Sequence, residues 1–303
     1  MAEMFDQAPV SAPEEKNRIV GGTLYLVATP IGNLADLSER ALKTLREVDF
    51  VAAEDTRNSQ RLLSHFSIRK ELVSYFEHNK RARGDLLLAR LLAGESCALI
   101  TDAGTPAVSD PGEDIVRLCA ENGVPVTGVP GCCAAVNALS LSALATGRFA
   151  FEGFLPPSGA DRRRRLEELK SERRTFILYE APHRLRATLA ELLAAFGDRP
   201  IALCREMTKL NEEIRRTTLS GAVATYETKE PRGEYVLVLA GTDAMPHDAS
   251  ADWFSSLSVE EHVKHYEEEG LLRMAAIKAV AKDRGVPKNE IYRQVNIEGK
   301  DEE

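Results

Sequence analysis

The chain has 303 residues, which is enough for two α/β domains of about 150 residues each and a short extension. Its composition, 44% hydrophobic and 28% charged, is typical of a globular protein, and no apolar run approaches the ~18–20 residues that span a bilayer. The net charge of −8 argues against a uniformly basic nucleic-acid-binding protein, although the two ends of the chain carry most of it. The five cysteines show no metal-ligand spacing, so we expect no metal site and a reducing, cytoplasmic setting.

Strands and helices alternate through the first half of the chain. We expect residues 1–20 to form a disordered leader, because they mix acidic residues, Pro and Ala without an apolar core. Short apolar runs then alternate with segments whose apolar residues recur at helical spacing, which predicts a mainly parallel sheet covered on both faces, in a domain over 21–131. The expected strands are 23–29, 50–53, 72–75, 97–101 and 124–129, and the expected helices are 39–48 with Ser38 as N-cap, 58–66, 83–92 and 113–121.

The same pattern restarts at Cys132 and predicts a second α/β domain over 132–243. Its expected helices are 134–145, 161–172 and 185–196, and its expected strands are 149–154, 175–179, 201–205, 216–219 and 235–240.

The end of the chain is predicted to be helical. After a linker at 242–250, three short helices at 259–268, 272–283 and 289–295 form an extension over 255–297. Their spacing resembles a helix-turn-helix. The acidic balance of this segment disfavours autonomous duplex binding and favours a docking or packing role.

The loop after the expected strand 97–101 is the strongest sign of a ligand site. Residues 102–112, with the sequence DAGTPAVSDPG, combine two Asp, two Gly and two Pro. Glycines let the backbone approach a ligand, prolines stiffen the loop, and ligands in open α/β sheets lie beyond the carboxyl ends of strands. The helix expected at 113–121 adds free N–H groups at its first turn. The alternative is an ordinary turn, but this density of special residues favours a binding role.

Motifs for phosphate-bearing cofactors are missing. The chain has no G-x-G-x-x-G, no G-x-x-x-x-G-K-S/T, no serine elbow and no H-E-x-x-H. A cofactor without phosphate, such as S-adenosylmethionine, is therefore favoured.

Five motifs in chain order closely resemble the ribosomal RNA small subunit methyltransferase I family, within the tetrapyrrole methylase superfamily. They are TLYLVATPIGN at 23–33, AEDTR at 53–57, ITDAGTP at 100–106 with SDPG at 109–112, LYEAPHR at 178–184 and REMTK at 205–209. The resemblance covers about residues 21–243. It implies two α/β domains of the tetrapyrrole methylase type with S-adenosylmethionine in the cleft between them, and a homodimer. The implied reaction methylates the ribose 2′-hydroxyl of one cytidine in small-subunit ribosomal RNA.

The resemblance also implies which residues contact the cofactor. The chain departs from the family at Cys132 and Cys133, where small hydroxyl residues are usual, which puts direct hydrogen bonding there in question. Tyr179 is equally typical of a core aromatic residue on a strand. The implied cofactor residues are Pro30, Asp102, Gly104, Thr105, Pro106, Val108, Ser109, Asp110, Ala134, Ala135, Asn137, Tyr179, Met207, Gly233 and Glu234.

Methyl transfer is an in-line displacement at a sulfonium, so most of the acceleration should come from aligning the nucleophile with the methyl group. The acceptor hydroxyl benefits from a nearby base or cation. Glu54 and Asp55, at the end of the expected strand 50–53, are the candidate acids or bases, and Lys209 or Arg57 is the candidate for stabilising alkoxide charge. The alternative is that Glu54, Asp55 and Arg57 form a structural ion-pair network or bind RNA phosphate.

Arginines supply the candidate RNA contacts. Four of them are consecutive and follow Pro156–Pro157, on an expected mobile flap, where they would neutralise phosphates. The alternative is a solvated helix face balanced by nearby glutamates, and His183 is expected to be a packed or capping residue. The target cytidine must be unpaired and splayed for its 2′-hydroxyl to reach the methyl group. The candidate RNA-binding residues are Arg57, Arg162, Arg163, Arg164, Arg165 and Arg184.

Two other functions stay open from the sequence. A tetrapyrrole carbon methyltransferase shares the superfamily fold, and fold alone does not decide function. The motifs at 53–57 and 178–184 and the arginine cluster nevertheless favour the ribosomal branch. A ligand-sensing regulator with a helix-turn-helix output would bind duplex nucleic acid through 255–297 and transfer no methyl group.

Overall fold

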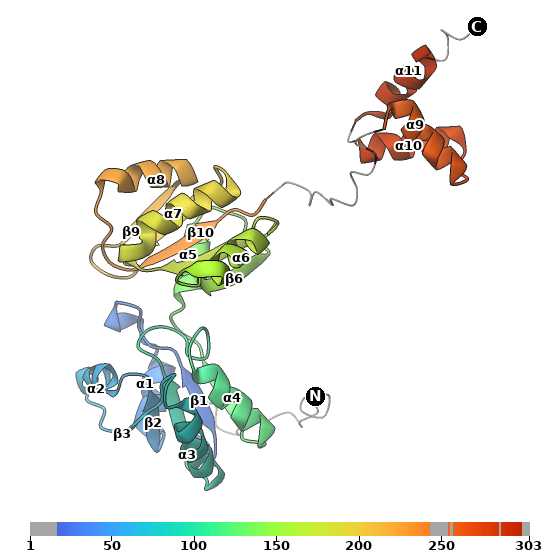
Figure 1. Ribbon diagram of the computed structural model, residues 1–303. Helices are drawn as coiled ribbons and strands as arrows, with labels where there is room; N and C mark the ends of the chain where they lie inside the picture. The colour runs from blue at the N-terminus through green and yellow to red at the C-terminus, as the bar shows by residue number, and fades with distance from the viewer. Residues whose placement is uncertain (1–16, 243–253, 255–256, 285, 299–303) are drawn as a thin grey trace. The chain divides into compact units, whose positions relative to one another are not determined.

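The computed structural model describes residues 17–242, 254, 257–284 and 286–298 (Figure 1). Residues 1–16 of the expected leader and 243–250 of the expected linker lie outside the described residues. The chain divides into two compact units, Met1–Thr242 and Asp243–Glu303. None of the described helices is both long and apolar enough to cross a membrane.

The first half of the large unit is a five-stranded parallel sheet in the order β3-β2-β4-β1-β5. One apolar cluster packs α1 (Glu39–Glu47) and α2 (Thr56–His65) on one face of the sheet, and a second packs α3 (Lys80–Leu92) and α4 (Gly112–Glu121) on the other. The predicted parallel sheet covered on both faces is therefore confirmed. Its strands are β1 (Leu24–Val27), β2 (Phe50–Ala53), β3 (Glu71–Ser74), β4 (Cys97–Ile100) and β5 (Val126–Val129).

Side-chain caps fix where the first two helices begin. The hydroxyl of Ser38 accepts a hydrogen bond from the amide of Ala41 at 3.1 Å, so the predicted N-cap of α1 is confirmed. Asp55 caps α2 in the same way, its Oδ1 accepting from the amide of Arg57 at 2.8 Å. Such caps stabilise a helix by about 1 kcal/mol. The carboxylate of Asp55 is thereby committed to the start of α2.

The second half of the large unit contains a mixed sheet in the order β6-β7-β10-β8-β9, in which only β6 and β7 pair in parallel. The helices α6 (Gly159–Leu169), α7 (Pro182–Phe196) and α8 (Leu219–Thr228) cover one face, and α5 (Ala134–Leu141) covers the other (Figure 1). Its strands are β6 (Phe149–Phe154), β7 (Thr175–Glu180), β8 (Pro200–Arg205), β9 (Glu213–Thr218) and β10 (Tyr235–Leu239).

Helix α8 is the α-helix that the sequence analysis missed, because it expected only a strand at 216–219. The strand β9 ends at Thr218, whose hydroxyl accepts from the amide of Gly221 at 3.3 Å and so starts the helix. Gly221 and the β-branched residues around it weaken the intrinsic helical signal. The buried face of Leu219, Ala222 and Tyr226, packed against the α7 layer, determines the helix instead.

Within its described residues, the second unit contains three α-helices at the predicted positions, α9 (Val259–Glu268), α10 (Arg273–Asp283) and α11 (Lys288–Glu298). Ser258 and Glu261 form a reciprocal capping box at the start of α9. The unit has a hydrophobic core of its own, made by Val263, Ala276, Ile277, Val280, Ala281, Ile291 and Val295.

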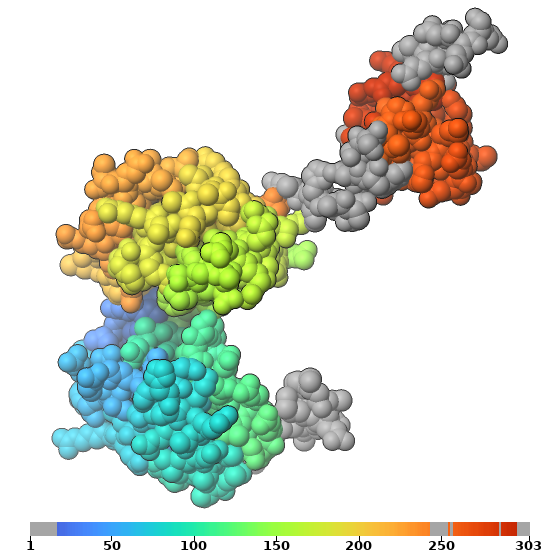
Figure 2. Space-filling model, viewed as in Figure 1, coloured from blue at the N-terminus to red at the C-terminus, as the bar shows by residue number. Residues whose placement is uncertain are grey.

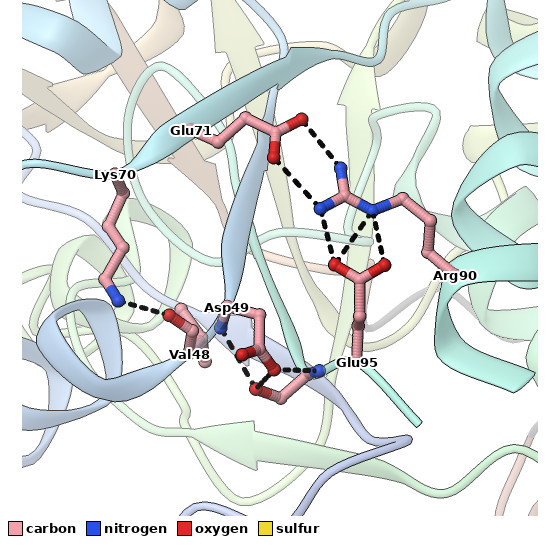
Figure 3. A network of polar contacts seen from close by, with 7 residues as sticks. Val48, Asp49, Lys70, Glu71, Arg90 and Glu95 are labelled. Carbon is pink, nitrogen blue, oxygen red and sulfur yellow. Dashed lines mark hydrogen bonds and ion pairs between the residues drawn. The ribbon is translucent and has the colours of Figure 1, made fainter. Parts of the chain in front are cut away.

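A polar network joins the amino ends of β2, β3 and β4 (Figure 3). Arg90 on α3 pairs with Glu71 (Nη1–Oε1, 2.7 Å) and Glu95 (Nη2–Oε2, 2.6 Å). Its guanidinium lies 3.6 Å from the centroid of the Phe50 ring. Beside it, Asp49 Oδ2 accepts from the Ser96 amide and hydroxyl, each at 2.7 Å. These contacts hold the amino ends of the strands in place. The loops at the carboxyl ends of the strands are not part of this network and can bind a ligand.

Replacing Arg90 with Met should lower the free energy of unfolding at pH 7 by about 1–2 kcal/mol, because the cation–π contact and both ion pairs are lost. The hydrogen bond from Arg90 lowers the pKa of Glu71. A carboxyl group whose folded pKa is lowered contributes stability above its unfolded pKa that is lost as the pH falls through the folded pKa. The cost of Arg90→Met should therefore shrink at about pH 3, as measured by urea denaturation. An equal cost at both pH values, or the same behaviour in the exposed control Arg46→Met, would contradict this role.

Candidate functional site

A cleft of about 920 Å³ lies between the two sheets of the large unit. Figure 2 shows the hollow between the blue-to-teal half and the yellow-to-orange half of this unit. The first half contributes residues from the segments that follow β1, β2, β3 and β4. The second contributes the start of α5, the carboxyl ends of β6, β7 and β8, and the start of β10. The cleft therefore lies where ligands bind in open α/β sheets, beyond the strand ends.

The structure brings twelve of the expected site residues together in this cleft, from segments far apart in the sequence. They are Glu54, Asp102, Gly104, Thr105, Val108, Ser109, Asp110, Ala134, Tyr179, Met207, Lys209 and Glu234.

The ends of β1 and β4 are joined beneath the cleft. Thr29 and Gly104 exchange backbone hydrogen bonds of 2.9 and 3.1 Å, and the Thr29 hydroxyl donates to the carbonyl of Thr101 at 3.1 Å. Gly104 has φ +88°, a conformation that favours glycine. Thr105 then donates from its hydroxyl to the carbonyl of Cys132 at 3.0 Å, which links the loop to the segment entering the second sheet.

The loop before α4 is held closed by one carboxylate. Asp110 Oδ1 accepts from the amides of Ala107 at 3.0 Å and Gly112 at 2.7 Å. Ala107 and Ser109 have φ values of 64° and 61°, so this loop holds two non-glycine residues in the left-handed region. The sequence analysis expected free N–H groups in the first turn of this helix. The first of them is not free, because the amide of Gly112 donates its hydrogen bond to Asp110.

Five expected cofactor residues do not line the cleft. Pro30 lines a separate cavity, and Pro106 is buried in the loop. Gly233 acts indirectly, since a Cβ there would lie 2.4 Å from Cγ of Glu206, and the glycine makes room for that side chain. The other two are on α5: Ala135 packs in the core and Asn137 is half-buried outside the cleft.

The cleft is strongly acidic. Among the described residues that line it, Lys209 is the one Lys or Arg, and it pairs with Glu206 at 2.8 Å and Glu234 at 2.9 Å. Burial lowers the pKa of Lys209, but the two carboxylates outweigh burial and raise it, so the ammonium stays charged. The carboxylate residues lining the cleft are Glu54, Glu77, Asp102, Asp110, Glu113, Glu180, Glu206 and Glu234.

The expectation that Asp55 serves as a catalytic base is corrected. Its side chain caps α2 and pairs with Arg57 at 2.9 Å, and it does not line the cleft. The hydrogen bonds from Arg57 lower the pKa of Asp55 to about 2, so it does not take a proton near neutral pH. Glu54 does line the cleft, and its Oε2 accepts from the Thr101 hydroxyl at 3.1 Å.

An aromatic group forms part of the second wall. Tyr179 lies edge-on to Phe151 and Phe154, with ring centroids 5.2 and 5.5 Å apart. Burial raises the pKa of Tyr179 to about 12, so it remains a neutral phenol. Tyr179 both packs against the core and lines the cleft. Phe154, which the sequence analysis missed, also lines the cleft and is exposed.

The arginine cluster lies on helix α6, and the expected mobile flap is corrected to an ordered helix. Arg162 is only 6% exposed and binds Glu191 at 2.6 Å, the Thr188 hydroxyl at 2.8 Å and the carbonyl of Pro156 at 2.9 Å. The expectation that Arg162 contacts RNA is therefore wrong, because its donors are used inside the protein. Arg163 is exposed.

The other candidate arginines are also partnered. Arg164 pairs with Asp161 at 2.8 Å, and Arg165 pairs with Glu152 and with Glu168. Arg184 donates to the carbonyl of Leu155 at 3.0 Å and lies 3.6 Å from Glu180, so its role is structural at least in part.

The sequence analysis missed several lining residues, because residues of these types are common outside binding sites and do not by themselves indicate one. Glu206 was the most accessible of these to prediction, since it directly follows the strand β8 within the REMTK motif. Within the described residues, no group of three His, Cys, Asp or Glu side chains could hold a metal ion. The missed lining residues are Ile31, Glu77, Thr101, Ala103, Pro111, Glu113, Phe154, Ala181, Pro182, Cys204, Glu206, Tyr235 and Val236.

Residues 23–223 match the family described as Tetrapyrrole (Corrin/Porphyrin) Methylases. The chain belongs to this family. It is 48% identical over 271 residues to a Halalkalibacterium halodurans protein named ribosomal RNA small subunit methyltransferase I, covering 89% of this chain and 93% of that one. Proteins of the same name from Bacillus subtilis and Escherichia coli O157:H7 are 43% and 42% identical, covering 91% and 90% of this chain and 94% of each relative.

Solved structures agree with this fold. Cobalt precorrin-4 methyltransferase superposes with a TM-score of 0.56 at 19% identity, covering 72% of this chain and 95% of that one. Uroporphyrin-III C-methyl transferase from Thermus thermophilus, complexed with S-adenyl homocysteine, gives 0.53 at 21% identity, covering 72% and 97%. The tetrapyrrole methylase fold and the family are thereby confirmed as predicted.

The buried Arg162 yields a stability prediction. Arg162→Ala should lower the free energy of unfolding by about 3 kcal/mol, because Glu191 and the Thr188 hydroxyl lose a buried partner. The exposed neighbour makes a matched control, and Arg163→Ala should change stability by less than about 0.5 kcal/mol. Urea denaturation of both variants would measure this difference. If both substitutions had equally small effects, the buried, partnered position of Arg162 would be contradicted.

Proposed function

We propose that this protein transfers a methyl group from S-adenosylmethionine to the ribose 2′-hydroxyl of one cytidine in small-subunit ribosomal RNA. The observation that carries the proposal is the acidic cleft between the two sheets in a chain closely similar to ribosomal RNA methyltransferases. Its partner is then the RNA or the assembled small subunit, in the cytoplasm, and the protein acts as a homodimer.

The charge of the cleft suits this chemistry. Eight carboxylate residues and one lysine line it, which favours a sulfonium cation over an anion. A tetrapyrrole substrate with several carboxylates would meet like charge from eight of the nine charged residues that line the cleft, whereas a ribose hydroxyl is neutral. The alternative of a tetrapyrrole carbon methyltransferase is therefore disfavoured by electrostatics. The alternative of a helix-turn-helix regulator is also disfavoured. Such a regulator would transfer no methyl group, whereas this chain belongs to a methylase family.

The side chains fit the cofactor by type. Gly104 and Ala134 offer small surfaces, and Asp102 and Ser109 offer acceptors for ribose hydroxyls. The ring of Tyr179 supplies an apolar wall. When bound, S-adenosylmethionine supplies an electrophilic methyl group.

Two residues of this chain are proposed to act on the acceptor hydroxyl. Glu54 is exposed at the end of β2, with one carboxylate oxygen held by Thr101, and would accept the hydroxyl proton. Lys209, kept charged by Glu206 and Glu234, would stabilise the oxygen as it loses that proton. The rigid loop closed by Asp110 keeps the donor side of the cleft in place, which favours alignment.

RNA phosphates are proposed to contact the exposed cations of the large unit. Arg57 has a side chain that is 86% exposed, and Arg163 and Arg164 are exposed on α6. The remaining candidates, Arg165 and Arg184, would contribute only by giving up internal partners.

The reaction can be tested by alkaline hydrolysis. The protein is incubated with labelled S-adenosylmethionine and small ribosomal subunits from cells that lack the modification. A 2′-O-methyl group blocks strand cleavage, so we expect the label to survive in one uncleaved dinucleotide containing cytidine. Label in a cleavable position, or no label with protein that binds the donor, would contradict the proposal.

The catalytic assignment predicts different effects on rate and on donor binding. Glu54→Gln should lower kcat by about 10²–10⁴-fold, because a general base is lost. Lys209→Met should lower kcat by about 10²–10³-fold, because charge on the oxygen is no longer stabilised. Calorimetry should show nearly unchanged affinity of Glu54→Gln for S-adenosylmethionine. Glu113, another carboxylate that lines the cleft, gives a matched control. If Glu113→Gln lowered kcat as much as Glu54→Gln does, the assignment of Glu54 as the general base would be contradicted.

A further inference from the structure

A second cavity, of about 380 Å³, lies within the first half of the large unit. One wall is helix α2, the other is the segment that follows β1, and the end of β4 closes it. Its volume falls in the range of about 300–1,000 Å³ typical of small-molecule sites. The lining residues are Thr29, Pro30, Gly32, Leu34, Asn58, Ser59, Arg61, Leu62, His65, Thr101 and Asp102.

This cavity adjoins the cleft. Thr101 and Asp102 line both, and Asn58 Nδ2 donates to Asp102 Oδ2 at 3.2 Å. Lys209, which lines the cleft, also packs over Gly32, where a Cβ would lie 2.4 Å from Lys209 Cγ. The proposed oxyanion-stabilising lysine therefore lies at the junction of the two spaces.

The charge of the second cavity differs from that of the cleft. Asn58, Arg61, Leu62 and His65 are spaced i, i+3, i+4 and i+7, so they share one face of α2. Arg61 and His65 are exposed, and Arg61 forms no ion pair with any other residue that the structure describes. The one carboxylate in this lining is Asp102, which Asn58 already engages.

The opposite wall is apolar, made by Pro30 and by Leu34, which is 41% exposed. An apolar wall facing a guanidinium, an imidazole and an amide matches the needs of an unstacked RNA base. Such bases stack on Arg planes and on rings including His, while their edges meet amides. The guanidinium of Arg61 also suits the attached phosphate.

We propose that this cavity binds one nucleotide of the substrate RNA, with its base between α2 and the Pro30–Leu34 segment and its phosphate on Arg61. The inference rests on the proposed RNA methyl transfer and deepens it. A nucleotide held here places the adjoining ribose at Thr101 and Lys209, where the cavity meets the cleft. Both the reacting cytidine and a flanking nucleotide have the required chemistry, so the experiment must separate them.

The first experiment measures binding of small-subunit RNA lacking the modification to the full chain in the presence of S-adenosylhomocysteine. Arg61→Ala should weaken RNA binding about tenfold or more and reduce the slope of log affinity against log salt by about 1. Arg69→Ala removes the same charge at another exposed position of this half, and it should change affinity less than threefold. Equal effects of the two substitutions would overturn the proposal, because they would indicate general electrostatics only.

The second experiment fills the cavity without a change of charge. Leu34→Trp should weaken RNA binding and leave the affinity for S-adenosylmethionine within twofold, as measured by calorimetry, with Tm reporting that the chain folds. Because Leu34 is partly exposed, the larger side chain is accommodated without core disruption. A matching loss of donor affinity, or unchanged RNA binding, would overturn the proposal, the former because it would make the cavity part of the cofactor site.

The third experiment identifies the nucleotide. RNA fragments with a single abasic residue, at the methylated position or at either neighbour, are bound to wild type and to Leu34→Trp. At the position that occupies the cavity, the abasic change and Leu34→Trp should no longer add. Additive effects at all three positions would overturn the assignment. Failure of the proposed reaction would appear separately, as unmethylated RNA that still binds in an Arg61-dependent manner.

Discussion

The site depends on how the ends of β1 and β4 are joined. The reciprocal hydrogen bonds between Thr29 and Gly104 bring two segments, 75 positions apart in the sequence, to the same point below the cleft. One of these segments continues into the stiff loop closed by Asp110, and the other carries Pro30 and Gly32 into the second cavity. Because Gly104 adopts a left-handed conformation, the loop can turn immediately after this junction and face the second sheet.

The large unit separates its charges in space. Carboxylates line the cleft between the sheets, whereas Arg57, Arg61 and His65 lie along α2 beside it. A cationic ligand and a polyanionic ligand would thereby be attracted to different walls of adjoining spaces. Lys209 is the exception within the cleft, and its two glutamate partners keep its charge locally balanced.

Much of the fold could be predicted, because buried strands such as Phe50–Ala53 and amphipathic helices such as Glu39–Glu47 carry a strong periodic signal. Helix α8 could not, since its stability comes from packing onto α7 and its sequence has weak helical propensity.

The site was predictable where a motif followed a strand, as at Asp102 and Glu54. It was not predictable where a side chain had a choice of partners. Four consecutive arginines gave no indication that Arg162 points inward to Glu191 and Thr188 while Arg163 faces water. Asp55 likewise could be assigned to a cap only once the start of α2 was known. Burial and pairing depend on the third dimension, which a linear pattern does not contain.

The Pro30–Leu34 segment has a mechanical consequence as well. Its Ile31 leaves the first sheet and packs into the apolar cluster of the second, beside Met207 and Tyr179. Swinging the halves apart would expose that side chain to water, so a wide hinge motion is resisted. The two halves of the large unit should accordingly move as one body, so a ligand would enter the cleft without a wide opening of the two sheets.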